Sequence, residues 1–168
     1  YGIDAAGSNV EATPEELSEV YADSADTHSL SYLEDPFHEE DFASHAKLLE
    51  RIGETTTIVG DDLTVTNRDR IEQAREAGSI NGVIIKPNQI GSLTETIDAV
   101  TYAREGGWQV VCSHRGGETT DDFIADIACG VGADGIKCGA PARGERVTKW
   151  NRLLAIHACA EGAPGRHI

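Results

Sequence analysis

Short runs of β-branched and other apolar residues recur along the chain, and most end on a polar or charged residue. The spacing between runs is about 26 residues, the length of one strand, one helix and two short loops. The pattern therefore predicts six consecutive βα units, whose strands are expected at residues 3–4, 30–34, 57–61, 83–86, 110–114 and 135–137.

Helix signals lie between these runs. Capping boxes begin at Thr13 and Ser92, and Asn67 is placed to cap a helix that ends at Gly78. The last helix is expected from about residue 145 to residue 160 because its apolar residues recur at helical spacing. Its expected apolar face consists of Val147, Leu153, Leu154 and Ile156.

Repeated βα units form either an open, doubly wound sheet or a (β/α)8 TIM barrel. Residues 5–8 read AAGS and lack the glycine-rich phosphate turn that would favour the open sheet. In a barrel the carboxyl ends of the strands form one ring, where active sites lie. The polar residues at the run ends favour that arrangement, and they are Asp4, Glu34, Asp61, Lys86, His114 and Lys137.

The predicted fold class is therefore α/β, of the (β/α)8 TIM-barrel type. A complete barrel typically needs about 250 residues. The chain has 168 residues and six predicted units, so we expect an incomplete barrel.

The composition is strongly acidic, with 29 Asp and Glu against 14 Lys and Arg and a net charge of −15. Such a surface repels phosphate backbones, so we expect no nucleic-acid partner. No apolar run is long enough to cross a membrane, and the cytoplasm is the expected location. Only four of the basic residues are lysines, which favours a halophilic protein over an ordinary acidic one.

The four cysteines show no C-x-x-C spacing and lie in or beside predicted strands and helices. We expect them to be buried, reduced side chains rather than disulfides or zinc ligands. They are Cys112, Cys129, Cys138 and Cys159.

Three carboxylates, those of Asp4, Glu34 and Asp61, fall at the same point of successive units. Carboxylates brought together repel one another unless a divalent cation compensates them, and all-oxygen ligation suits Mg²⁺. Each acid taken alone is more typical of a helix cap or a solvated loop than of a metal ligand, whereas three in register favour a metal site. Asp35 and Asp62, which follow two of them, are expected to support ligands or to cap helices.

Lys86 ends the most apolar run, where a lysine either reaches for water or acts as a positioned base. Lys137 is expected to face the same ring. Ser113, His114 and Arg115 add a hydroxyl, an imidazole and a guanidinium before a glycine pair, which suits a phosphate or carboxylate. Taken singly, His114 is as typical of a protein core as of a binding site. Arg115 is likewise as typical of a protein surface as of a binding site.

Five segments follow one another along the chain and read YLEDPF at residues 32–37, GDDLTVTN at 60–67, KPNQIGS at 86–92, SHRGGET at 113–119 and IKCGAP at 136–141. In this order they resemble the signature motifs of the enolase (phosphopyruvate hydratase) family. The resemblance implies that residues 1–168 are the C-terminal part of an enolase TIM-barrel domain. The N-terminal capping domain and the first barrel strands would then lie outside this chain.

The resemblance also implies a set of roles. The substrate pair would be 2-phosphoglycerate and phosphoenolpyruvate, and Mg²⁺ would be the cofactor, held by Asp4, Glu34 and Asp61. Lys86 would remove the C2 proton, a pairing of lysine base and Mg²⁺ that is established for enolase-superfamily sites. Lys137 would stabilise the charged intermediate, and His114, Arg115 and Ser113 would contact substrate, with Arg115 on the phosphate.

The sequence departs from the family pattern at Gly116, where a serine that contacts phosphate and a second metal is usual, and at Cys138 and Gly144. The family's general acid belongs to its N-terminal part, so this chain alone is expected to be inactive. A homodimer or higher homo-oligomer is expected.

Two alternatives remain at this stage. One is an acid-sugar dehydratase or racemase of the same superfamily, although Ile84 stands where a K-x-K strand has its first lysine. The other is a non-catalytic interaction remnant, whose unpaired strand edges would favour association.

Overall fold

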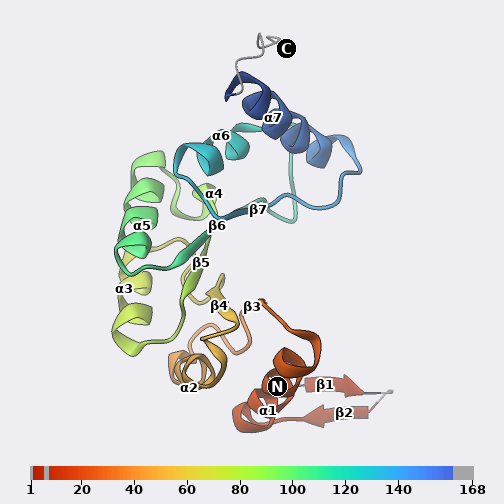
Figure 1. The fold of residues 1–168 in the computed structure, drawn as a ribbon, viewed down its shortest axis with the longest axis vertical. Coiled ribbons are helices and arrows are strands. Elements are labelled where there is room, and N and C mark those ends of the chain that lie inside the picture. Colours follow the sequence, from red (N-terminus) through yellow and green to blue (C-terminus); the bar gives the residue numbers. More distant parts are fainter. Residues whose placement is uncertain (1, 6–7, 161–168) are drawn as a thin grey trace.

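The computed structural model describes the backbone of residues 2–5 and 8–160 and the side chains of residues 12–160. Within these ranges five parallel strands form one sheet in chain order, as successive βα units dictate. Figure 1 shows that this sheet curls into an arc, which confirms an incomplete barrel of the TIM type. The strands are β3 (Tyr32–Glu34), β4 (Thr57–Gly60), β5 (Gly82–Ile85), β6 (Gln109–Ser113) and β7 (Gly135–Lys137).

Helices line the outer side of the arc (Figure 1). Helix α1 packs on α2, and the final helix packs on α6. None of the described helices is long and apolar enough to span a membrane. The helices are α1 (Pro14–His28), α2 (Phe42–Ile52), α3 (Arg68–Ala77), the single turn α4 (Pro87–Ile90), α5 (Leu93–Glu105), α6 (Phe123–Gly130) and α7 (Gly144–Ala160).

The predicted helix ends are confirmed. Thr13 forms a reciprocal capping box with Glu16, and the Ser92 hydroxyl accepts from the backbone amide of Glu95. Asn67 accepts from two amides of the first turn of α3, and that helix ends at Gly78 with φ of 62°. Glycine adopts this left-handed conformation without steric cost, which explains the sharp end.

The strand register decides which side chains face inward. Paired residues of a parallel sheet point to the same face, and alternate residues of a strand point to opposite faces. Ile58, Val83 and Val110 join the core between sheet and helices, so Val59 and Ile84 lie on the inner face. The same alternation puts the polar strand-end residues on that inner face, namely Glu34, Asp61, Lys86, Ser113 and Lys137.

One glycine leaves room for two side chains of β4. A Cβ atom on Gly82 would lie 2.7 Å from Thr57 Cγ2 and 2.9 Å from Val59 Cγ2. Real Cβ atoms do not approach other carbons so closely, so these side chains would have to move to admit any other residue here. The packing of β4 beside β5 therefore favours glycine at this position.

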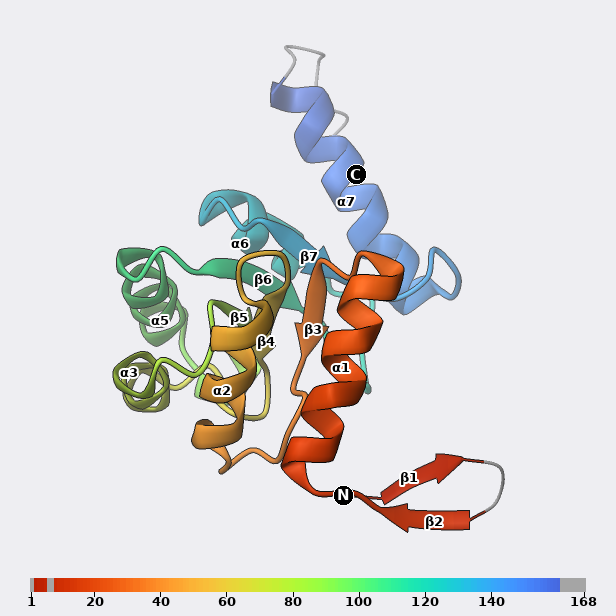
Figure 2. The same cartoon turned by 60° about the horizontal axis from the view of Figure 1, so that its bottom comes forward.

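The strand predicted at residues 3–4 is present, but its predicted place in the parallel sheet is wrong. This segment belongs to β1 (Gly2–Ala5), which pairs antiparallel with β2 (Ser8–Glu11) in a separate two-stranded sheet (Figure 2). Two short strands with a two-residue connection favour a hairpin, whereas parallel pairing needs a crossover. The parallel sheet thus has five strands rather than six, and the Asp4 side chain lies outside the described residues.

Two expectations about burial are also corrected. Cys112 and Cys138 are buried, but Cys129 and Cys159 are exposed, and all four are free. The expected apolar face of α7 is only partly covered, since Leu154 is 66% exposed and Val147, Leu153 and Ile156 are half-buried. The reason is that only one face of α7 meets the rest of the described chain, and its one buried residue is Lys149.

Candidate active site

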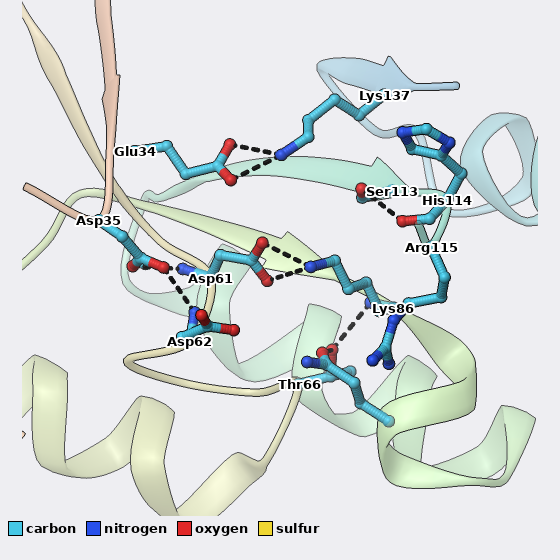
Figure 3. A network of polar contacts seen from close by, with 12 residues as sticks. Glu34, Asp35, Asp61, Asp62, Thr66, Lys86, Ser113, His114, Arg115 and Lys137 are labelled. Atoms are coloured by element: carbon cyan, nitrogen blue, oxygen red, sulfur yellow. Dashed lines mark hydrogen bonds and ion pairs between the residues drawn. The ribbon is translucent and has the colours of Figure 1, made fainter. Parts of the chain in front are cut away.

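Two lysine–carboxylate pairs lie at the carboxyl ends of the strands, on the inner face of the sheet (Figure 3). Lys86 Nζ donates to both Asp61 oxygens, at 2.7 and 2.5 Å. Lys137 Nζ donates to both Glu34 oxygens, at 2.6 and 2.8 Å. The second pair joins the last strand of the sheet to the first, so the curl of the sheet brings all four charges together.

The Lys86–Asp61 pair is the more buried of the two, with side-chain exposures of 12% for Lys86 and 9% for Asp61. Burial raises the pKa of Asp61, and the neighbouring Glu34 charge acts in the same direction, against the lowering effect of Lys86. Burial also acts to raise the pKa of Glu34, but hydrogen bonding to Lys137 and its charge outweigh burial and lower that pKa. The two carboxylates are thus close enough to repel, and the lysines are their counter-ions.

Asp35 holds the end of β4 in place. Its two carboxylate oxygens accept from the backbone amides of Asp61 and Asp62, at 2.9 and 2.7 Å. Asp35 itself has φ of 43°, which is uncommon for a residue with a side chain. This finding agrees with the predicted supporting role of Asp35 and explains how Asp61 is aimed at Lys86.

Thr66 holds the start of the segment that carries Lys86. Its hydroxyl accepts from the backbone amide of Lys86 at 2.8 Å and donates to Gln89 Oε1 at 3.1 Å. Thr66 is fully buried and has φ of 59°, and Val65 before it has φ of 44°. Such conformations cost about 1–3 kcal/mol each and cluster at functional sites. Sequence reasoning missed Thr66, and its only signal is a β-branched run too short for a strand.

The segment after β6 lies beside this cluster. The Ser113 hydroxyl is buried and donates to the carbonyl of His114 at 2.9 Å, so it braces the backbone. Arg115 Nη1 lies 3.4 Å from Asn88 Oδ1. A cavity of about 370 Å³ is lined by Asn88, Ser113, Arg115 and Lys149. This cavity lies beside Arg115 and does not include the lysine–carboxylate pairs, which lie on the open inner face.

Helix α7 supplies two cations that bind this segment and that sequence reasoning missed. Arg146 contacts the His114 ring and donates to the carbonyls of Arg115 and Gly116. Lys149 pairs with Glu118 at 2.7 Å. Both residues lie in a predicted helix without any local motif, so only the tertiary structure shows their targets.

The carboxylates offer hard oxygen ligands of the kind that Mg²⁺ prefers. Among the described residues, Asp35, Asp61 and Asp62 form the group whose oxygens all lie within 4.8 Å of one another. However, Asp35 is already engaged by two amides and Asp62 is exposed. Glu34 and Asp61 are also engaged, each by a lysine, but they repel each other across the inner face, and a divalent cation would compensate that repulsion.

The structure therefore brings together most of the predicted site. Glu34, Asp61, Lys86 and Lys137 form one cluster, and His114 and Arg115 follow on the next strand end. Ser113 is turned toward the backbone, and Asp4 belongs to the separate hairpin.

The family profile described as "Enolase, C-terminal TIM barrel domain" matches residues 2–163. The chain belongs to the enolase family. It is 48% identical over 151 residues to a curated protein named "Enolase" from Methanopyrus kandleri, a match covering 90% of this chain and 35% of that protein. It is 49% identical over 144 residues to one of the same name from Mycobacteroides abscessus, covering 86% of this chain and 34% of that protein. This enolase-family chain thus spans about a third of the length of both relatives.

Proposed function

We propose that the intact protein containing this chain interconverts 2-phosphoglycerate and phosphoenolpyruvate with Mg²⁺, as an enzyme of glycolysis and gluconeogenesis. The observation that carries the proposal is the Lys86–Asp61 pair on the inner face of the barrel, next to the Lys137–Glu34 pair. The names of the two relatives support the same reaction.

Lys86 is proposed as the base. Lys86 Nζ is paired with Asp61 as an ammonium and has to lose one proton before it can act as the base. The neutral amine then takes the proton from C2 of 2-phosphoglycerate, and the C–H electron pair is delocalised onto the substrate carboxylate as a charged intermediate. This electron pair forms the C2–C3 double bond when hydroxide leaves C3. The leaving hydroxide takes a proton from a general acid outside the residues identified in this chain, which yields water. Thr66 and Asp61 hold Lys86 at its backbone amide and at Nζ, so the base is already placed before substrate arrives.

Positive charge around the substrate is the second requirement, because proton removal creates an additional negative charge. Lys137 is proposed to stabilise that charge, and Arg115 and His114 to bind the phosphate end. Mg²⁺, held by Glu34 and Asp61 with Asp4 as a further proposed ligand, would neutralise the substrate carboxylate when bound.

We further propose that residues 1–168 are the C-terminal part of a TIM-barrel domain, completed by other strands and a capping domain of the intact protein. Strands β3 and β7 end the sheet of the described residues, and unpaired edges of this kind normally acquire partners. The 168-residue chain alone should show no appreciable turnover. The intact protein is proposed to be cytoplasmic and homo-oligomeric.

The charge of −15 supports a halophilic origin. A surface of this kind repels itself when little salt is present. Circular dichroism should show structure at molar salt and its loss at low ionic strength, and a spectrum independent of salt would refute this origin.

Phosphoenolpyruvate formation by the intact protein tests the function. Lys86→Ala should lower kcat by about 10²–10⁴-fold with Mg²⁺ present, the range typical for removal of a general base. Lys47→Ala is the matched control, because Lys47 is 68% exposed and its ion pair is with Glu15, which is 69% exposed. Undiminished turnover in Lys86→Ala would refute the base, and no turnover by the wild type would refute the reaction.

A further inference from the structure

We propose that Arg146 and Lys149 of α7 are positioning residues for residues 113–119, the substrate loop. We propose in particular that Arg146 fixes His114 as the neutral tautomer that carries its proton on Nε2. His114 then acts toward the substrate as a hydrogen-bond donor and not as a base. The substrate role of this loop rests on the proposed function, whereas the state of the His114 ring does not.

Arg146 binds three successive residues of the substrate loop. Its guanidinium contacts His114 Nδ1, and it donates to the carbonyl of Arg115 at 3.0 Å and to that of Gly116 at 3.0 Å. The arginine stem reaches the loop past Gly139, where an added Cβ would lie 3.1 Å from Arg146 Cδ. A planar guanidinium has five donors in a fixed fork, so one side chain sets the path of all three residues.

The contact with His114 decides the state of the imidazole ring. A guanidinium is always protonated and can only donate, so the nitrogen that faces it must be an acceptor. His114 Nδ1 therefore carries no proton, and the ring proton lies on Nε2, which has no hydrogen-bond partner among the described residues. Burial and the Arg146 charge both lower the pKa of His114, in agreement with a neutral ring.

Lys149 and Glu118 hold the far end of the same loop. Lys149 Nζ pairs with Glu118 at 2.7 Å and donates to the carbonyls of Thr119 and Glu145, both at 2.8 Å. Glu118 in turn accepts from the Arg115 backbone amide at 2.8 Å. Arg115 is therefore held at its amide through Glu118 and at its carbonyl by Arg146.

The burial pattern of α7 supports a role beyond packing. Arg146 and Lys149 lie three residues apart, on one face of the helix. Lys149 is 1% exposed, whereas every apolar residue of α7 is half-buried or exposed. Burying an ammonium costs several kcal/mol unless it is paired and hydrogen-bonded, so an apolar residue would serve stability as well. The buried residue of α7 is thus the lysine that binds the substrate loop.

The state of His114 is tested by ¹⁵N spectroscopy of histidine-labelled intact protein at neutral pH, with His114→Gln identifying the signal. The wild type should show a neutral ring with its proton on Nε2. Arg146→Met, which removes the donors but keeps a long stem, should yield a mixture of both tautomers, and Arg146→Lys should largely restore the wild-type state. Arg152→Gln is the matched control, because Arg152 lies on the same helix and pairs with Asp126 of α6.

Kinetics provide the second readout. Arg146→Met should lower kcat/KM about a hundredfold through displacement of the loop. The rise in KM should exceed the fall in kcat, since the loop binds substrate and Lys86 does the proton transfer. Glu118→Gln should act in the same direction but less, and Arg152→Gln should stay within about twofold.

A proton on Nδ1 or a doubly protonated ring in the wild type would overturn the proposal, as would an unchanged His114 spectrum in Arg146→Met. If Arg146→Met does not fold, Arg146→Lys together with the wild-type spectrum still decides the tautomer. If the wild type shows no turnover of 2-phosphoglycerate, the proposed function fails and the spectrum decides the His114 proposal alone.

Discussion

The two sides of the candidate site are built in different ways. On the carboxylate side, β3 to β5, each functional residue is held by a neighbour from the same short motif or the next one, as Asp35 holds Asp61 and Thr66 holds Lys86. On the loop side, His114 and Arg115 are held by Arg146, more than 30 positions further along the chain. The carboxylate side is buried and braced by its own strands, whereas the loop side depends on one helix.

This difference teaches where rigidity comes from in the half-barrel. The side chains that brace the carboxylate side join neighbouring units of the sheet: Asp35 follows β3 and holds the end of β4, and Thr66 follows β4 and holds the end of β5. These braces are therefore placed when the strands themselves pair. Positioning by α7 requires that the helix first docks on α6. The loop side should therefore be the more sensitive to changes far from the site.

On the carboxylate side, the substitution of a proposed metal ligand should have the largest effect. Asp61→Asn should weaken Mg²⁺ binding by the intact protein about tenfold to a hundredfold, because one anionic ligand is lost. Calorimetric titration with Mg²⁺ measures the effect. Asp62→Asn is the control, and an equal loss in that variant would move the metal from Glu34 and Asp61 to the group of Asp35, Asp61 and Asp62.

Thr66→Val tests through the free energy of unfolding how strongly the carboxylate side is braced. The substitution keeps the branched shape but leaves the Lys86 amide without its acceptor, which should cost about 1–3 kcal/mol. Denaturant unfolding of the intact protein measures it. Thr101→Val, at an exposed position of α5, is the control and should change stability by no more than about 0.5 kcal/mol. Equal effects of the two substitutions would mean that Thr66 does not brace the base.

The smallest expected effect concerns pH and the loop side. Burial acts to raise the pKa of Glu118, but its hydrogen bonds with Lys149 and the Arg115 amide outweigh burial and lower that pKa. A lowered folded-state pKa stabilises the protein above the unfolded-state value, near pH 4.5, and this stability is lost as pH falls through the folded-state value. When the pH falls from 7 to 3, the unfolding free energy of Glu118→Gln should therefore decrease by about 1 kcal/mol less than that of the wild type.

Urea unfolding at the two pH values measures this difference. Glu105→Gln, an exposed substitution on α5, serves as control and should lose as much stability as the wild type. A Glu118→Gln variant that also matches the wild type would show that the Lys149 pair does not stabilise the loop.

Much of the carboxylate side could be predicted from the sequence. Apolar runs that end on charged residues indicated β3, β4, β5 and β7, and the carboxyl ends of barrel strands meet in one ring. The four charges of the two ion pairs were thus expected at one ring before their partners were known. The pairing itself was not predictable, because it depends on how far the sheet curls.

The rest depends on tertiary structure. The segment at residues 3–4 looked like a sixth barrel strand, but a hairpin with β2 competes for its backbone hydrogen bonds. Helix α7 was recognised from its periodicity, yet nothing in that pattern showed that Lys149 rather than its leucines would be buried. Neither Arg146 nor Thr66 has a sequence signal that separates it from ordinary helix and loop residues.

The Lys137–Glu34 pair also bears on how the molecule folds. Its partners are 103 residues apart, so the contact forms only after the intervening chain has been ordered. Each neighbouring strand pair closes a much shorter loop, and the entropy of loop closure favours the shorter ones first. This ion pair should then be among the last native contacts to form. A chain arrested before that stage could already have the Lys86–Asp61 pair in place, yet Glu34 and Lys137 would be too far apart to act on one substrate molecule.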